Sequence, residues 1–159
     1  MRSSLRTGLV AGVTGLVFGA AGGVAYSATI NGTSGNDVLN GTSAADDIYG
    51  FEGNDSISGN DGADALNGGW GADYLYGNQK GDNVFAGPEN DHLYGNAGND
   101  TLDGMAGVDY SEGGEGDDYL FAGGDQKVDT VDGGDGTDTC WVSASDIWTN
   151  CQYFNWVSF

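Results

Sequence analysis

The chain has 159 residues, of which 31 are glycine, and its 24 acidic against 4 basic side chains give a formal net charge of −20. Such a charge excludes nucleic acid and anionic membrane surfaces as partners, because a polyanion is repelled by the field of the whole protein. Twenty of the acidic residues are Asp, and both Asp and Gly are disfavoured in helix interiors, so a helical bundle is excluded as well.

The first 28 residues predict a secretory signal peptide. Arg2 and Arg6 form a short basic region, residues 9–24 are apolar or small without a charge, and a stretch of mostly small residues follows at 25–28. A transmembrane anchor is the weaker interpretation, because the apolar stretch is broken by glycines and is shorter than the roughly 20 residues of a membrane span. Cleavage would leave Lys80 and Lys127 as the only cations and a net charge of −22. The chain is therefore expected to be secreted, with no membrane insertion of the mature protein.

The next segment, residues 29–141, repeats with a period of nine. An apolar residue follows each in-frame Asp by two positions in eleven of twelve units, and Gly precedes it by five positions in all units but one, which has Ala86. A two-residue insertion near Ala122 interrupts the frame once. The in-frame residues are Asp37, Asp46, Asp55, Asp64, Asp73, Asp82, Asp91, Asp100, Asp109, Asp118, Asp129 and Asp138.

Each unit predicts a turn followed by a very short strand. Glycines at the first and fourth positions permit positive φ, and polar turn formers fill the rest of the first six positions. The last three residues alternate outside, inside and outside, with one apolar side chain pointing inward. Two units then form one coil, residues 18 apart stack at the strand spacing of about 4.8 Å, and the fold class is an all-β, right-handed parallel β-roll of about twelve units in six coils.

The stacked Asp columns predict a bound cation. Like charges about 5 Å apart repel, and the inward apolar side chains are too few to compensate for ordering so many residues. The available donors are carboxylate and carbonyl oxygens, without a thiolate or imidazole cluster, and these donors favour Ca²⁺ over Zn²⁺, Cu²⁺ or Mg²⁺.

Segments such as 50–58 and 95–103 resemble the RTX nonapeptide of calcium-binding parallel β-rolls. The resemblance covers about residues 31–141 and implies that Ca²⁺ is held between stacked turns by the Asp carboxylates and turn carbonyls of units n and n+2. One edge would use Asp37, Asp55, Asp73, Asp91 and Asp109, and the other Asp46, Asp64, Asp82, Asp100 and Asp118. Asp129 and Asp138 are further candidates, although the insertion predicts disturbed stacking there.

Some units depart from this pattern. Lys80 and Glu89 replace the glycine at the fourth position, and Pro88 stiffens the same turn as Glu89. The ammonium of Lys80 could stand in for a metal ion. Ser111 puts a hydroxyl at an inward position, which predicts a weak point in the core unless it is hydrogen-bonded.

The C-terminal segment, residues 142–159, has lost the period and carries several aromatic residues. A solenoid needs a cap on its last coil, and the aromatic side chains around Trp148 and Phe154 favour that role over a ligand platform. Cys140 and Cys151 are the only cysteines, and secretion would place them in an oxidising compartment. We therefore expect a disulfide between them.

No catalytic constellation is evident, so we expect no enzyme. His92 is the only histidine, and its outward position predicts a solvated surface residue. The carboxylates follow the repeat period, which metal binding already explains.

Three other functions differ in what the outward faces do. The first is a secreted calcium-binding β-roll, folded by extracellular Ca²⁺, with a surface or matrix role. The second is an adhesion module for a polysaccharide or cell-surface partner, because outward columns place Tyr74, His92 and Tyr110 in a row beside Tyr76 and Tyr94. Cross-strand packing explains the same columns more simply. Ice binding is disfavoured, because the outward columns are mixed.

Overall fold

The computed structural model describes residues 26–122 and 124–156. The predicted signal peptide falls almost entirely on residues 1–25, which lie outside the described residues. All regular secondary structure in the described ranges is β-strand. None of these residues forms a helix long and apolar enough to span a membrane.

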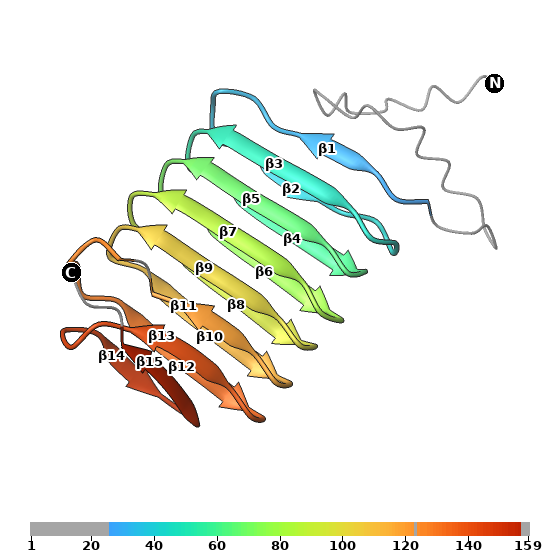
Figure 1. The fold of residues 1–159 in the computed structure, drawn as a ribbon. Helices are drawn as coiled ribbons and strands as arrows, with labels where there is room; N and C mark the ends of the chain where they lie inside the picture. The colour runs from blue at the N-terminus through green and yellow to red at the C-terminus, as the bar shows by residue number, and fades with distance from the viewer. Residues whose placement is uncertain (1–25, 123, 157–159) are drawn as a thin grey trace, which may run out of the picture.

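Fifteen strands in the described ranges wind into a parallel β-roll, with odd-numbered strands in one sheet and even-numbered strands in the other (Figure 1). The odd-numbered sheet contains β1 (Thr29–Asn31), β3 (Asp47–Glu52), β5 (Ala65–Trp70), β7 (Asn83–Pro88), β9 (Thr101–Ala106), β11 (Tyr119–Phe121), β13 (Thr139–Val142) and β15 (Tyr153–Trp156). The even-numbered sheet contains β2 (Val38–Asn40), β4 (Ser56–Asp61), β6 (Tyr74–Gln79), β8 (His92–Ala97), β10 (Tyr110–Glu115), β12 (Thr130–Asp135) and β14 (Ile147–Thr149).

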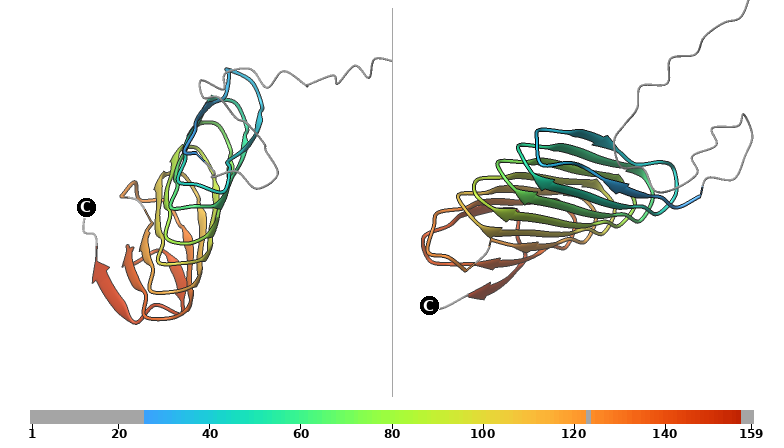
Figure 2. Two further views of the ribbon diagram at one scale, coloured as in Figure 1. Left: turned by 90° about the vertical axis from the view of Figure 1, so that its right-hand side faces the viewer. Right: turned by 90° about the horizontal axis from the view of Figure 1, so that it is seen from above.

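The core is a thin layer of inward side chains between the two sheets. Strands pair in parallel with residues 18 apart opposite each other, as for Ile48 on Leu66 and Leu66 on Val84. These side chains are fully buried. Figure 2 shows the coils stacked along one axis. The predicted β-roll is therefore confirmed, but it has about seven coils, because β1, β14 and β15 extend the ladder beyond the regular repeats.

The internal geometry of the unit differs from the prediction. Most middle strands are six residues long, not three, and the left-handed backbone lies at the second and fourth positions, as at Asn60 (φ 73°) and Gly62 (φ 154°). The glycine at the first position, such as Gly59, lies inside the strand and faces inward. It is needed for space, because a Cβ there would lie 2.8 Å from the carbonyl oxygen of Gly77 and against the carboxylate of Asp64.

The two-residue insertion leaves the ladder in register. Beyond it, residues 20 apart face each other, as for Tyr110 and Thr130 and for Leu120 and Cys140. The prediction that stacking is disturbed there is therefore wrong. The two extra residues lie in the connection after β11, outside the paired strands. Ser111 is buried at the inward position between Leu93 and Val131.

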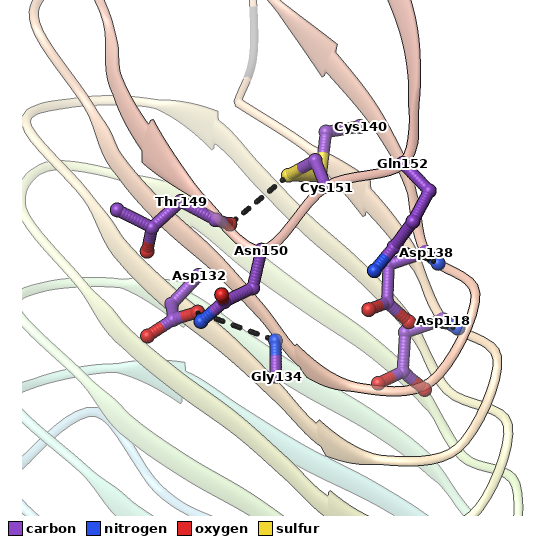
Figure 3. Close-up of a disulfide and its surroundings, with 9 residues drawn as sticks. All are labelled: Asp118, Asp132, Gly134, Asp138, Cys140, Thr149, Asn150, Cys151 and Gln152. Carbon is purple, nitrogen blue, oxygen red and sulfur yellow. Dashed lines mark hydrogen bonds between the residues drawn. A yellow bond between two sulfur atoms is a disulfide. The ribbon is translucent and has the colours of Figure 1, made fainter.

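The C-terminal segment adds one strand to each sheet. Trp148 lies opposite Val131 and Phe154 opposite Cys140, so both aromatic side chains take inward positions of the repeat. Their ring centroids are 4.3 Å apart. The predicted disulfide between Cys140 and Cys151 is present, with Cα atoms 5.9 Å apart (Figure 3). It joins the last regular strand to the final coil.

Candidate metal centre

The twelve in-frame Asp residues form two columns, one at each edge of the roll. Each of these Asp residues directly precedes a strand. The Asp residues of one column precede the even-numbered strands, and those of the other column precede the odd-numbered strands. Asp37 is half-buried. The other eleven are at most 4% exposed: Asp46, Asp55, Asp64, Asp73, Asp82, Asp91, Asp100, Asp109, Asp118, Asp129 and Asp138. The predicted ligand residues are thus brought together along each edge.

A backbone hydrogen bond holds each of the eleven buried carboxylates, from Asp46 to Asp138, against the preceding coil. The N–H of Asp55 donates to Oδ1 of Asp73 at 2.7 Å, and the N–H of Asp73 donates to Oδ1 of Asp91 at 2.8 Å. The same bond spans the insertion, where the N–H of Asp109 donates to Oδ1 of Asp129 at 2.9 Å. Asp129 therefore belongs to the column despite the shifted spacing.

The second carboxylate oxygen is left without a partner through most of the roll. Oδ2 is buried and accepts no hydrogen bond in nine described residues: Asp55, Asp64, Asp73, Asp82, Asp91, Asp100, Asp109, Asp118 and Asp138. Buried polar atoms are nearly always paired in folded proteins. Nine unpaired acceptors of one kind, in two lines, form a donor set that favours a positively charged partner.

At the start of the roll, threonine residues donate hydrogen bonds to this second carboxylate oxygen. The sequence analysis did not predict these threonine partners. Oδ2 of Asp37 accepts hydrogen bonds from the N–H and hydroxyl of Thr33, at 2.6 and 2.9 Å. Oδ2 of Asp46 accepts from the N–H and hydroxyl of Thr42, at 2.5 and 2.9 Å. Thr at the second position of a unit is the signal, and the unpaired oxygens begin at Asp55.

Burial raises the pKa of the column carboxyls from Asp55 to Asp138 above the usual value for Asp. Asp82 shows the pattern, because the charges of Asp64 and Asp100 in the same column add to the effect of burial on its pKa. The pKa rises to about 7 for Asp82, Asp91, Asp109 and Asp118, and to about 6 for Asp73, Asp100 and Asp129. A fully ionised column is therefore unfavourable without a cation.

The space beside most of these unpaired oxygens also contains a carbonyl oxygen. A Cβ built on Gly77 would lie 2.5 Å from Oδ2 of Asp82 and 2.9 Å from the carbonyl oxygen of Gly95. No group of three or more His, Cys, Asp or Glu side chains gathers as a metal site among the described residues. A cation would thus need backbone carbonyls in addition to carboxylates, and an all-oxygen donor set suits Ca²⁺.

The irregular units keep the column intact. Lys80 and Glu89 adopt positive φ at the fourth position, 72° and 82°. Glu89 Oε2 accepts a hydrogen bond from the N–H of Gly71 at 3.0 Å. The charge of Lys80 lowers the pKa of Asp64, although burial still raises it overall. Asp91 keeps its unpaired Oδ2 although Ala86 replaces the glycine five residues before it.

The predicted aromatic columns are present on the even-numbered sheet. Tyr74 stacks on His92 with ring centroids 4.6 Å apart, and Tyr76 stacks on Tyr94 at 5.1 Å. Tyr110 packs on His92 from the other side at 5.9 Å. His92 lies on the outer face as predicted but is half-buried, because Tyr74 stacks on one face of its ring and the tilted ring of Tyr110 packs beside it.

The fold and its two lines of buried carboxylates define a parallel β-roll with Asp-rich turns. A family model described as the RTX calcium-binding nonapeptide repeat matches the chain in four copies, over residues 22–50, 49–79, 76–111 and 124–144. These matches cover more than half of the chain, which therefore belongs to this calcium-binding family. Comparisons with curated proteins and with solved structures gave no match.

Proposed function

We propose that this protein is a secreted β-roll that holds Ca²⁺ between its stacked turns and folds when the ion binds. The observation that carries the proposal is the set of nine buried, unpaired Asp oxygens in two columns. Calcium would supply positive charge to carboxylates that water no longer solvates. Because an unfolded chain has no preformed columns, the binding free energy would contribute directly to folding.

The ligands would be the carboxylates of Asp residues from successive coils together with turn carbonyls. All twelve in-frame Asp residues remain candidates, but the nine with an unpaired Oδ2 have the greatest need for a cation. Asp37 and Asp46 already have threonine partners for that oxygen. Asp129 is included because it keeps the hydrogen bond to Asp109 across the insertion.

Secretion and an extracellular surface or matrix role complete the proposal. The sequence of residues 1–28 and the disulfide between Cys140 and Cys151 support it, because disulfides persist in oxidising compartments. Extracellular calcium would then act as the signal that the chain has reached its destination.

A calcium titration of the mature chain, followed by far-UV circular dichroism and small-angle scattering, tests the coupling. We expect a largely disordered chain in chelator and a compact, β-rich chain at millimolar Ca²⁺. Asp82→Asn, which keeps the size of the side chain but removes its charge, should raise the calcium midpoint. Asp47→Asn, on an exposed outward side chain, is the matched control and should leave it unchanged. Identical spectra and radii with and without calcium would contradict the proposal.

Adhesion to a polysaccharide is the second candidate, and it receives less support. Stacking on a sugar ring requires a free aromatic face, whereas His92 and Tyr94 have their faces against neighbouring rings. Cross-strand packing therefore accounts for most of this aromatic area. We also propose no catalytic role, because the carboxylates follow the repeat and His92 is enclosed by Tyr74 and Tyr110.

A further inference from the structure

The last coil, formed by β14 and β15, carries less charge than the middle coils. Every acidic residue of the chain lies between Asp37 and Asp146, and residues 147–159 contain no charged side chain. Repulsion between charged surfaces acts over a Debye length of about 8–10 Å at physiological salt. Residues 26–36 at the other end also contain no charged side chain, so a second copy of this acidic protein meets less repulsion at either end of the roll than at its middle.

The same end exposes apolar side chains. Trp148 and Phe154 are 38% and 37% exposed, although they occupy inward positions where Val131 and Cys140 in the preceding coil are 1% and 0% exposed. No further coil covers them in the described residues. Ile147 and Tyr153 beside them are 59% and 61% exposed. Clustered apolar groups of this kind mark interaction sites more often than scattered single residues do.

Within residues 26–122 and 124–156, both sheets also end there with an unpaired edge. β14 is the outermost strand of the even-numbered sheet, and β15 is the outermost strand of the odd-numbered sheet (Figure 1). Natural edge strands are usually protected by charges, proline or bulges. The sequences Ile-Trp-Thr of β14 and Tyr-Phe-Asn-Trp of β15 contain neither charge nor proline.

We propose that the last coil is a dimerisation surface, on which a second copy of this chain docks end to end. A partner that satisfies both edges must present two strands at the separation of the two sheets, and the last coil of another copy does so. A two-fold axis perpendicular to the roll would bring the edge strands of the copies together in antiparallel pairs. It would also bury Trp148 and Phe154 of each copy against the other. Such isologous contacts form the commonest oligomers, and this association goes beyond calcium binding.

The experiment is sedimentation velocity of the calcium-loaded mature chain over a range of concentrations. We expect a monomer–dimer equilibrium. Replacing both outward, exposed residues, as Ile147→Lys with Tyr153→Lys, should weaken the dimer at least about tenfold, because four lysines then meet at one interface. The single change Tyr153→Lys is the milder variant if the pair disturbs folding, and circular dichroism with calcium verifies the fold of each.

Two matched lysine variants give the controls. Val108→Lys, on a side chain that is 49% exposed in the middle of the roll, should leave the dimer unchanged. Val38→Lys lies on β2 at the opposite end and is 72% exposed; it should also have no effect. A monomer at all concentrations would overturn the proposal. Equal sensitivity to Val38→Lys and Tyr153→Lys would overturn it in favour of a head-to-tail chain.

Discussion

The middle coils and the last coil share one backbone ladder but stabilise it with different chemistry. In the middle, Leu, Ile or Val fills the inside of most strands, with Ser111 as an exception, and a buried Asp carboxylate lies at each edge. In the last coil, Trp148 and Phe154 take the inward positions, and a disulfide fixes the turn between β14 and β15. Among the described residues, the buried Asp oxygens without a hydrogen-bond partner are confined to the coils between Asp55 and Asp138.

The ends of the Asp columns support this distinction. At the last coil, Oε1 of Gln152 accepts the hydrogen bond from the N–H of Asp138 at 2.6 Å, so a neutral amide replaces the carboxylate of the regular units. At the first coil, Thr33 and Thr42 satisfy the carboxylates of Asp37 and Asp46. The column therefore begins with hydroxyl partners and ends, on the edge of Asp138, with an amide.

Removal of the disulfide, which fixes the last coil, should cause the largest loss of stability among the changes considered. The bridge closes a loop with a sequence separation of 11, and the chain-entropy estimate for such a loop is about 3 kcal/mol. Cys151→Ser should raise the calcium midpoint for folding and increase binding of a hydrophobic dye. Calcium titration of the oxidised and reduced wild-type protein provides the control. An unchanged midpoint would mean that the last coil contributes nothing to folding of the middle.

The middle coils should be sensitive to a single methyl group at an inward glycine. In Gly77→Ala the new Cβ meets Oδ2 of Asp82 and the carbonyl oxygen of Gly95, and overpacking of this kind costs about 1–3 kcal/mol. Gly35→Ala is the control, because the nearest atom to its Cβ is 3.9 Å away. Denaturant unfolding in calcium should separate the two variants, and equal stabilities would refute the role of the inward glycine.

Acid should partly replace calcium in the middle coils. The folded-state pKa values of Asp82 and Asp91 are raised to about 7, above an unfolded value of about 3.9. Protonation is thus tighter in the folded chain, so these groups contribute stability that is full at low pH and is lost as the pH rises through about 7. Circular dichroism of the calcium-free chain should show more β-structure at pH 5 than at pH 8. Asp82→Asn should reduce the difference, and a pH-independent spectrum would contradict the explanation.

Substitution of an outward aromatic side chain in the middle coils should have the smallest effect on the stability of the folded protein. Tyr76 stacks on Tyr94, and such a pair contributes about 0.5–1.5 kcal/mol beyond its buried area. Tyr76→Leu should therefore cost less stability than Trp148→Leu, whose ring covers the inward column at the end of the roll. Chemical denaturation of both variants in saturating calcium measures the difference. A larger loss for Tyr76→Leu would indicate that the outer columns stabilise the roll more than its cap does.

The period of nine was sufficient to predict the parallel roll, both Asp columns and the aromatic rows, because a solenoid places residues at fixed spacing above one another. The pairing of Cys140 with Cys151 was also predictable, since the chain has no other cysteine. These features follow from local periodicity and composition. They need no knowledge of how distant segments pack.

Only the tertiary structure decided which carboxylate oxygens lack a partner and where the ladder ends. The period ends at Cys140, yet β14 and β15 continue the sheets, because backbone hydrogen bonds between strands do not depend on the repeat sequence. Asp129 stays in its column for the same reason, with the extra residues looped out before it. The partners that Thr33, Thr42 and Gln152 provide arise from contacts within a turn or between coils, and the spacing of Asp residues alone carries no information about them.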